Sequence, residues 1–305
     1  MNALILVLKG VLMGIANIIP GVSGGTIAVV LHVFDPMIEA INNFYKGKKQ
    51  FFKHAKFLIP LFLGALIGVG AFSKLIKFCL ETYSLPTSMF FAGLVTGSLP
   101  LIYGKAREKE VKPKYYIAAA LAFLIVVAFS LLKEPEAADG TTALTALNFI
   151  KIAFFGVIAS SAMVIPGISG SFVMMLLGIY NKLITAVSGL IDEIAALPGN
   201  IGSEGLLTAL KALVCSESFF IIAAVGIGVV VGIVIISKII EILLKKVYSY
   251  TYFAILGLIL GSLFSIFKDP VTYQSYSGTV SIAPVVCAVV TFAAGTALSL
   301  FLGRE

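Results

Sequence analysis

The chain has 305 residues, of which 59% are hydrophobic and 12% are charged, and its formal net charge is +7. Soluble domains carry about 25% charged residues, so this composition excludes an ordinary soluble fold. The basic residues gather in short segments between apolar runs, which is a topology signal rather than the footprint of a nucleic-acid-binding protein. We predict an all-α polytopic membrane protein, because the apolar runs lack the alternating pattern of a membrane β-barrel.

The first half of the chain, residues 1–135, is predicted to form one repeat. A helical hairpin over residues 3–45 is followed by membrane spans over residues 57–80, 86–103 and 114–132. These spans are close to the roughly 20 residues that cross a bilayer as a helix. The first residues have no basic segment before their apolar stretch and no clear small-residue cleavage site, so no signal peptide is expected.

The second half, residues 146–305, repeats this pattern with a hairpin over residues 148–190 and spans over residues 217–244, 250–267 and 280–302. The clearest match joins Pro20-Gly21-Val22-Ser23-Gly24-Gly25-Thr26 to Pro166-Gly167-Ile168-Ser169-Gly170-Ser171-Phe172. Three further matches follow in order, namely Gly64/Gly68 with Gly228/Gly232, residues 72–76 with 236–240, and residues 93–98 with 257–262. The longer spacing in the second half indicates an insertion near residues 192–211, which is either a lid or a connector. Four ordered matches indicate an internal duplication within a single integral membrane domain.

The two repeats are predicted to have inverted topology. Each hairpin crosses the membrane an even number of times, whether it is re-entrant, as we expect, or spans twice. Three further spans make the total odd, so the second half starts on the opposite side. The basic loops 46–56 and 105–114 fall on one predicted side together with Lys245, Lys246 and Arg304, and residues 133–139, the insertion and residues 268–278 fall on the other. The positive-inside rule then puts both termini in the cytoplasm.

Each Pro-Gly-x-Ser-Gly motif breaks a helix inside an apolar hairpin, because proline lacks an N–H donor and glycine adopts dihedral angles that other residues resist. Within a membrane, the backbone groups at such a break need protein or a polar cavity around them. Helices that resume at about Ser23 and Ser169 would direct N–H groups and positive dipole ends at the break, which suits an anion such as phosphate. Two alternatives remain open: a cation held by carbonyl groups, and a kink whose serine hydroxyls satisfy only local backbone groups.

The predicted phosphate-binding residues combine both motifs with two repeat-equivalent lysines that could hold a phosphate oxygen by charge. For these lysines, snorkelling to the membrane surface is the alternative. The set is Asn17, Gly21, Ser23, Gly24, Gly25, Thr26, Gly167, Ser169, Gly170, Ser171, Lys74 and Lys238. Further ionisable residues could relay protons, with an interfacial or capping role as the alternative for each; they are His32, Asp35, Glu39, Lys151, Glu217 and Glu241.

An enzymatic interpretation starts from residues 21–25, which satisfy the G-x-S-x-G pattern of a hydrolase nucleophile. That nucleophile needs a preceding strand, a histidine and an acid. Here the flanking segments are predicted to be helical, and the only histidines are His32 and His54. The three cysteines are widely separated and match no metal-ligand spacing. We predict no catalytic residue, no metal and no cofactor.

The stretch of residues 14–26, GIANIIPGVSGGT, together with residues 165–172, IPGISGSF, resembles the polyprenyl-phosphate transporter family, formerly a domain of unknown function. The resemblance covers nearly the whole chain. It implies a flippase that moves undecaprenyl phosphate, the carrier lipid of envelope polymer synthesis, from the outer to the cytoplasmic leaflet of a prokaryotic cell membrane. The sequence departs from the pattern at Asn17, where some relatives carry an acid, and at His32-Val33-Phe34, where the second half has Gly178-Ile179-Tyr180. The resemblance therefore assigns no coupling role to Asn17 or His32.

The implied mechanism holds the phosphate in a polar groove between the hairpins while the polyprenyl tail stays in lipid and the inverted halves alternate access. Moving a negative charge inward opposes an inside-negative potential by about 2.3 kcal/mol per charge per 100 mV, so coupling to protons or another cation is a hypothesis. The alternatives are a carrier for another phosphorylated or anionic solute, a lipid-phosphate hydrolase or transferase, and a non-transporting scaffold. The expected partners are the lipid substrate and the bilayer, with no nucleic acid and no predicted oligomeric state.

Overall fold

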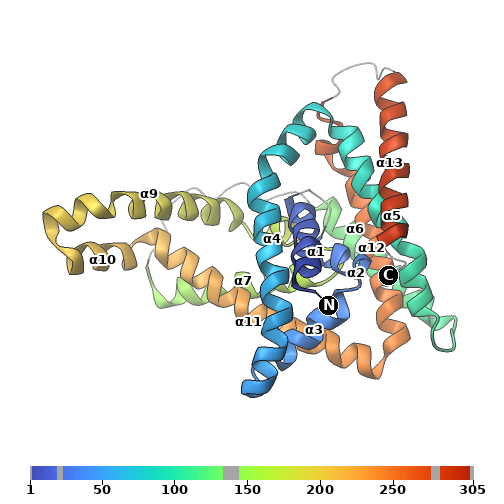
Figure 1. Ribbon diagram of the computed structural model, residues 1–305, viewed down its shortest axis with the longest axis horizontal. Coiled ribbons are helices and arrows are strands. Elements are labelled where there is room, and N and C mark those ends of the chain that lie inside the picture. Colours follow the sequence, from blue (N-terminus) through green and yellow to red (C-terminus); the bar gives the residue numbers. More distant parts are fainter. Residues whose placement is uncertain (1, 19–22, 133–143, 276–281, 303–305) are drawn as a thin grey trace. The chain divides into compact units, whose positions relative to one another are not determined.

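The computed structural model describes residues 2–18, 23–132, 144–275 and 282–302 (Figure 1). Within these ranges the secondary structure is helical and no β-strand occurs, which confirms the predicted all-α class. Seven described helices are long and apolar enough to cross a membrane, so the chain is a multi-pass membrane protein. They are α4 (Lys48–Thr82), α5 (Ser84–Ala106), α6 (Lys114–Leu131), α7 (Ala146–Val164), α11 (Glu217–Lys246), α12 (Tyr248–Lys268) and α13 (Ile282–Leu302). Gly21 of the first motif, and residues 133–139 and Arg304 of the predicted topology, lie outside the described residues.

Each predicted hairpin contains a sharply bent pair of helices. In the first, α1 (Ala3–Ile18) precedes α2 (Gly24–Val30) and α3 (Phe34–Asn43), and α2 and α3 are bent by 112°. In the second, α7 precedes α8 (Gly170–Leu176) and α9 (Tyr180–Glu204), and the corresponding bend is 106°. The segment predicted as an insertion is helical, because it contains the end of α9 and the short helix α10 (Leu206–Val214).

The two bends use the same turn. In the first hairpin the amides of His32 and Val33 donate hydrogen bonds back to α2, at 3.1 and 2.9 Å, and in the second Gly178 and Ile179 donate back to α8, at 2.9 and 3.1 Å. This pair of bonds forms a Schellman-type cap, which places the residue after the helix in the left-handed region. The φ angle is 55° at His32 and 68° at Gly178. The first hairpin therefore has His32, and the second Gly178, at the position of the turn that favours glycine.

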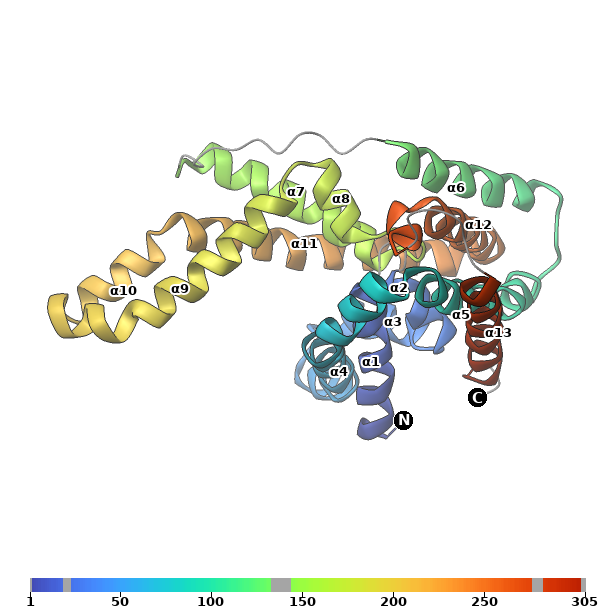
Figure 2. The ribbon, with the colours of Figure 1, turned by 90° about the horizontal axis from the view of Figure 1, so that it is seen from above.

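The helices form two compact units, one of Met1–Leu131, Met163–Ser169 and Ile236–Glu305, and the other of Leu132–Ala162 and Gly170–Ile235. The first unit combines helices from both halves of the sequence. In it, α1 packs along α4, α5 along α13, and α6 along α12 (Figure 2). This unit contains the described part of the first motif and the turn of the second, so it holds the centre of the predicted site.

Glycines allow the helices of the first unit to approach closely. A Cβ atom at Gly64 of α4 would lie 2.1 Å from a carbonyl oxygen of α1. At Gly93 of α5 it would lie 2.1 Å from a carbonyl oxygen of α13, and at Gly257 of α12 it would lie 2.0 Å from one of α6. Small residues permit such contacts between membrane helices, which is the packing role that the GxxxG pairs predict.

The first hairpin begins and ends at the same end of this unit. Gly10 of α1 faces Leu61 of α4, and Gly14 faces Ala65, so equal steps along the two helices show that they are parallel. Only residues 44–47 join α3 to α4. The start of α1 and the end of α3 therefore both lie where α4 begins, which is the geometry expected of a re-entrant hairpin.

Helices α5 and α12, which occupy equivalent places in the two sequence repeats, run antiparallel. The amide of Ser84, at the start of α5, donates to the hydroxyl of Ser275, just beyond the end of α12, at 3.0 Å. Toward the opposite ends, Lys105 of α5 donates to the hydroxyl of Tyr252 of α12 at 3.3 Å. Successive glycine contacts between α5 and α13 move toward the C-terminal end of both helices, so these two helices are parallel.

The second unit contains most of α7, the helices α8 to α10, and the first part of α11. A Cβ atom at Gly228 of α11 would lie 2.0 Å from the carbonyl oxygen of Ala153 of α7, so this pair also packs through small residues. The hydroxyls of Ser216 and Ser218 donate to the carboxylate of Glu193 at 2.6 and 2.9 Å. These hydrogen bonds connect α9 to the start of α11.

Candidate functional site

The two Pro-Gly-x-Ser motifs meet inside the first unit. The amide of Gly167, in the second motif, donates a hydrogen bond of 2.8 Å to the hydroxyl oxygen of Thr26, in the first. Gly25 lies against the end of α7, just before this motif, since a Cβ atom there would be 2.9 Å from the carbonyl oxygen of Val164 and 3.3 Å from that of Met163. These contacts join positions as many as 141 residues apart in the sequence. The tertiary structure thus places the start of α2 beside the turn of the second motif.

The first motif forms a local network at the start of α2. Ser23 is the N-cap of this helix, with extended backbone, and its Oγ accepts a hydrogen bond of 3.2 Å from the amide of Gly25. The amide of Gly24 donates to Oδ1 of Asn17 at 2.9 Å. Two of the N–H groups expected to face an anion are therefore already bonded within the protein. A phosphate bound to these N–H groups would replace the contacts made by Asn17 and Ser23.

The second motif is held against α12 by its glycine. The φ angle of Gly167 is +88°, and a Cβ atom would lie 2.4 Å from the carbonyl oxygen of Leu258. Both the backbone angle and the available space require glycine at this position. Pro166 is buried and Ser169 is half-buried, and α8 begins directly afterwards at Gly170. The turn is therefore a closely packed element rather than a loose loop.

A charged cluster lies at the bend of the first hairpin. Nζ of Lys105 lies 2.8 Å from Oδ2 of Asp35, and the hydroxyl of Tyr252 donates to the same oxygen at 2.6 Å. The ammonium group also lies 5.4 Å from the centre of the Tyr252 ring. Oδ1 of Asp35 is buried and has no hydrogen-bond partner within the described ranges. The cluster connects the start of α3 to the antiparallel pair α5 and α12.

A polar cavity of about 550 Å³ opens beside this cluster. It is lined by α3, the start of α4, and the junction between α11 and α12. Its walls carry both signs of charge, from Asp35, Glu39, Lys53, Glu241 and Lys245 among others. The cavity therefore gathers ionisable groups at the end of the unit that carries the basic loops.

Comparison with known proteins identifies the family. A family model described as undecaprenyl phosphate translocase-like matches residues 13–281, a range that includes both motifs. This chain belongs to that family. The match confirms the resemblance that the two Pro-Gly-x-Ser motifs indicate. In this family member, the matched range also contains the residues that join the motifs and those of the charged cluster.

Two curated relatives support the same assignment. A polyprenyl-phosphate transporter of Staphylococcus aureus is 34% identical over 302 residues, which cover 98% of this chain and 95% of the relative. A polyprenyl-phosphate transporter of Vibrio cholerae is 30% identical over 278 residues, which cover 86% of this chain and 77% of the relative. No solved structure matches the chain. The similarity extends over the whole membrane domain of this family member rather than over one motif.

The structure gathers most of the predicted site residues but not all of them. The first unit brings together Asn17, Ser23, Gly24, Gly25, Thr26, Gly167 and Ser169. Gly170 and Ser171 begin α8. Lys74 and Lys238 lie on exposed faces of α4 and α11, and among the described residues no hydrogen bond or ion pair joins either lysine to a motif. Phosphate binding by this set stays a prediction.

Two members of the charged cluster carry no signal in the sequence. Lys105 belongs to a run of loop cations, and Tyr252 lies near the start of a span, where an aromatic residue usually marks the membrane interface. Asp35 is among the predicted relay candidates. Its two partners are 70 and 217 positions away, so no local pattern could have identified them.

Proposed function

We propose that this protein is a transporter that moves undecaprenyl phosphate, or a related polyprenyl phosphate, from the outer to the cytoplasmic leaflet of the cell membrane. Family membership, the names of the two relatives and the multi-pass helical fold support the proposal. The observation that carries it is the hydrogen bond between Gly167 and Thr26, which brings the two broken-helix motifs together in one unit. Such a protein binds and releases its substrate without a chemical step, so we propose a transporter and not an enzyme.

The helix directions support an inverted repeat with both termini in the cytoplasm. The repeat-equivalent helices α5 and α12 run antiparallel, as inversion requires. Helix α1 starts at the end where α4 carries Lys48 and Lys49, and α13, parallel to α5, ends where α5 carries Lys105. Under the positive-inside rule, this basic end faces the cytoplasm.

The phosphate is proposed to bind where the motifs meet. A phosphate monoester offers three strong acceptor oxygens, which suit hydroxyl and amide donors. Ser23 and Ser169 supply hydroxyl groups, and Gly24 and Gly25 supply amides once Asn17 and Ser23 release them. Thr26 contributes indirectly, since its oxygen accepts the bond that joins the motifs. The other residues of the predicted set, Gly21, Gly170, Ser171, Lys74 and Lys238, are not part of this proposed meeting point and stay predictions from the sequence.

The decisive experiment is leaflet exchange of undecaprenyl phosphate in vesicles that contain the purified protein. The motif variant Ser23→Ala/Ser169→Ala is compared with Ser98→Ala/Ser262→Ala, which removes two buried hydroxyls that bond only their own helices, at 2.6 and 2.8 Å. Hydrogen bonds to a charged group contribute about 1.5–3 kcal/mol each. The motif variant should therefore lose at least about tenfold in exchange rate, while the control keeps the parent rate.

Each other outcome has a definite meaning. Equal exchange by both double variants would keep the function and move the phosphate site elsewhere. No exchange by the parent under any imposed gradient would contradict the proposal, and release of inorganic phosphate would indicate an enzyme. We also propose coupling to protons or another cation, because inward movement of the phosphate opposes the membrane potential. An exchange rate that is insensitive to pH and ion gradients would contradict the coupling alone.

A further inference from the structure

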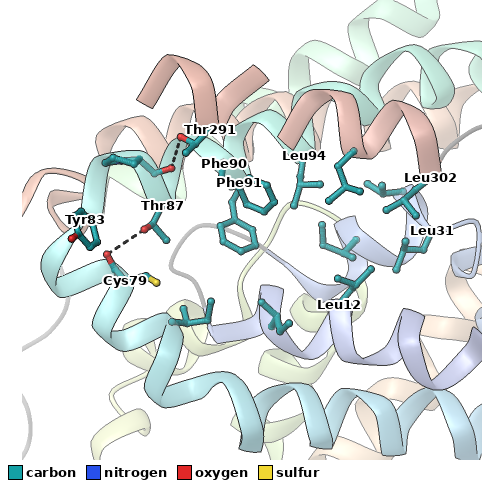
Figure 3. Close-up of a pocket in the computed structure, with 16 residues that line it drawn as sticks. Leu12, Leu31, Cys79, Tyr83, Thr87, Phe90, Phe91, Leu94, Thr291 and Leu302 are labelled. Atoms are coloured by element: carbon teal, nitrogen blue, oxygen red, sulfur yellow. Dashed lines mark hydrogen bonds between the residues drawn. The ribbon is translucent and has the colours of Figure 1, made fainter. Parts of the chain in front are cut away.

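Two apolar cavities lie in the first unit. One is lined in part by α2, the helix that follows the first motif, and the other by Pro166 of the second motif. The first has a volume of about 440 Å³ and is lined by α1, α2, α4, α5 and α13. Figure 3 shows Phe90, Phe91 and Leu94 of α5 on one side of it and Leu12 and Leu31 on the other. The second has a volume of about 350 Å³ and is lined by the second motif with α3, α6, α11 and α12.

One wall of each cavity is built from equivalent positions of the two sequence repeats. Eight residues from Ile76 to Leu94 line the first cavity, and each has its equivalent 164 positions later, from Ile240 to Leu258, in the wall of the second. This offset is the one that relates residues 72–76 to residues 236–240. An incidental gap between helices would not reproduce its lining in the other repeat. The α4–α5 wall of the first cavity and the α11–α12 wall of the second are therefore equivalent by duplication.

Polar atoms in the walls are turned away from the cavity space. In the first cavity the hydroxyl of Thr87 donates to a backbone carbonyl at 3.2 Å, and that of Thr291 does so at 2.7 Å (Figure 3). In the second, the hydroxyl of Thr251, which is equivalent to Thr87, donates to a backbone carbonyl at 3.0 Å. The surfaces that remain are hydrocarbon, so each cavity favours an apolar chain rather than a solute.

Each cavity includes one of the two junctions between consecutive spans, and the first also runs along α13 to Leu302. Ile27 and Val30 of α2, the helix that Ser23 caps, line the first cavity, and Pro166 of the second motif lines the second. The first cavity extends to Tyr83, between α4 and α5, and the second to Val247, between α11 and α12. Because α5 and α12 are antiparallel, these two junctions lie at opposite ends of the unit.

We propose that the cavities are two binding sites for the isoprene units next to the phosphate of a polyprenyl phosphate, one for each leaflet. The first cavity holds the chain while the lipid is entering from the outer leaflet. The second cavity, at the basic end, holds the chain when the lipid is on the cytoplasmic side. The phosphate stays near the joined motifs while the chain changes cavity. The inference rests on the proposed function, because it takes the transported lipid as the occupant.

Size and shape favour this occupant over an ordinary phospholipid. A water molecule takes about 30 Å³ of liquid volume, so each cavity holds roughly 12 to 15 groups of that size, or about two or three five-carbon units. Most of a polyprenyl chain would remain in the bilayer. Ile27 and Val30 of the cavity wall lie on α2, whose N-cap is Ser23, so a chain held there would have its phosphate end near the start of α2. A phospholipid would instead have to place a glycerol group and the first parts of two chains in the same space, which holds only about 12 to 15 such groups.

Photolabelling tests the inference directly. The probe is undecaprenyl phosphate with a diazirine on an isoprene unit near the phosphate, in vesicles of phosphatidylethanolamine and phosphatidylglycerol. We expect labelled peptides from residues 83–94 and 247–258, and displacement of the label by unlabelled undecaprenyl phosphate. Phosphatidic acid has the same phosphate monoester but two acyl chains, and it should not displace the label.

Filling one cavity at a time gives a sharper test. Leu12→Trp should remove at least about nine-tenths of the label from residues 83–94 only, and Ala254→Trp should do so for residues 247–258 only, a tenfold loss in occupancy that corresponds to about 1.4 kcal/mol. Leu66→Trp, at a position of α4 that is 69% exposed, is the matched control and should leave both peptides labelled. Should a variant fail to fold, Thr291→Trp and Ala118→Trp fill the same cavities from α13 and α6.

The outcomes separate this inference from the proposed function. Label spread over all lipid-facing helices, or displaced equally by phosphatidic acid, would overturn the inference. Leaflet exchange by the parent without label in either cavity would overturn the inference and leave the proposed function intact. Label in both cavities without leaflet exchange would support the binding sites and count against transport.

Discussion

The amide of Gly167 donates a 2.8 Å hydrogen bond to the hydroxyl oxygen of Thr26, and this bond joins the two motifs of the chain. Thr26 is 0% exposed, and Gly167 is also buried. Neither group can exchange its partner for water at low cost, since buried polar groups depend on the bonds they make within the protein. Any movement that separates the two motifs must therefore break this bond.

Thr26→Val should destabilise the protein while keeping the shape of the side chain. The buried amide of Gly167 would lose its acceptor, at a cost of about 1–3 kcal/mol, and the midpoint of thermal unfolding in nanodiscs should fall. Thr26→Ser keeps the hydroxyl and should lose less. Equal midpoints for the valine and serine variants would show that the hydrogen bond is not what stabilises the contact.

Gly25→Ala should push the two motifs apart. Its Cβ atom would meet the carbonyl oxygens of Val164 at 2.9 Å and Met163 at 3.3 Å, and such overpacking costs about 1–3 kcal/mol. Gly70→Ala in α4 is the control, because nothing lies within 4 Å of its Cβ position and alanine favours the helix by about 1 kcal/mol. We expect reduced unfolding midpoint and leaflet exchange for the first variant only; matching behaviour of the two would argue against a close motif contact.

His32→Gly should stabilise the first hairpin. A left-handed backbone costs a non-glycine residue about 1–2 kcal/mol, and His32 adopts a φ of 55° at the turn where the second hairpin has Gly178. Part of the gain is offset because glycine increases the entropy of the unfolded chain, so a net stabilisation of about 0.5–1 kcal/mol is expected. Gly178→Ala should show the opposite sign. Chemical unfolding in detergent measures both, and an unstable His32→Gly variant would mean that the imidazole makes a stabilising contact.

The ion pair between Asp35 and Lys105 should contribute modestly to stability. Its side chains are 38% and 25% exposed, so solvent screening limits the coupling in a double-mutant cycle with Asp35→Asn and Lys105→Met to about 1 kcal/mol. The exposed pair Lys77 and Glu81, at 3.7 Å, is the matched control and should give about 0–0.5 kcal/mol. Raising the salt concentration should reduce the control coupling first. A coupling near zero for Asp35 and Lys105 would assign the cluster no stabilising role.

Local features of the sequence predicted much of the helical structure. Long apolar runs predicted spans because every backbone polar group must be satisfied inside a membrane, and helices α4 to α6 and α11 to α13 occupy those runs. The position of Ser23 predicts an N-cap for the helix after the first motif, and its Oγ accepts a hydrogen bond from the amide of Gly25. By contrast, the sequence does not predict the left-handed turn at His32, because histidine does not indicate a positive φ as glycine does at Gly178.

The sequence by itself determined the membrane class, the two hairpins, the repeated motifs and the family, because these depend on hydrophobicity, helix-breaking residues and spacing along one segment. Only the tertiary structure decided that Gly167 bonds to Thr26, that Asp35 is held by Lys105 and Tyr252, and that equivalent walls from the two repeats line two apolar cavities. These features depend on which helices pack together and in which direction. That choice is made by close glycine contacts between distant segments, which no local periodicity records.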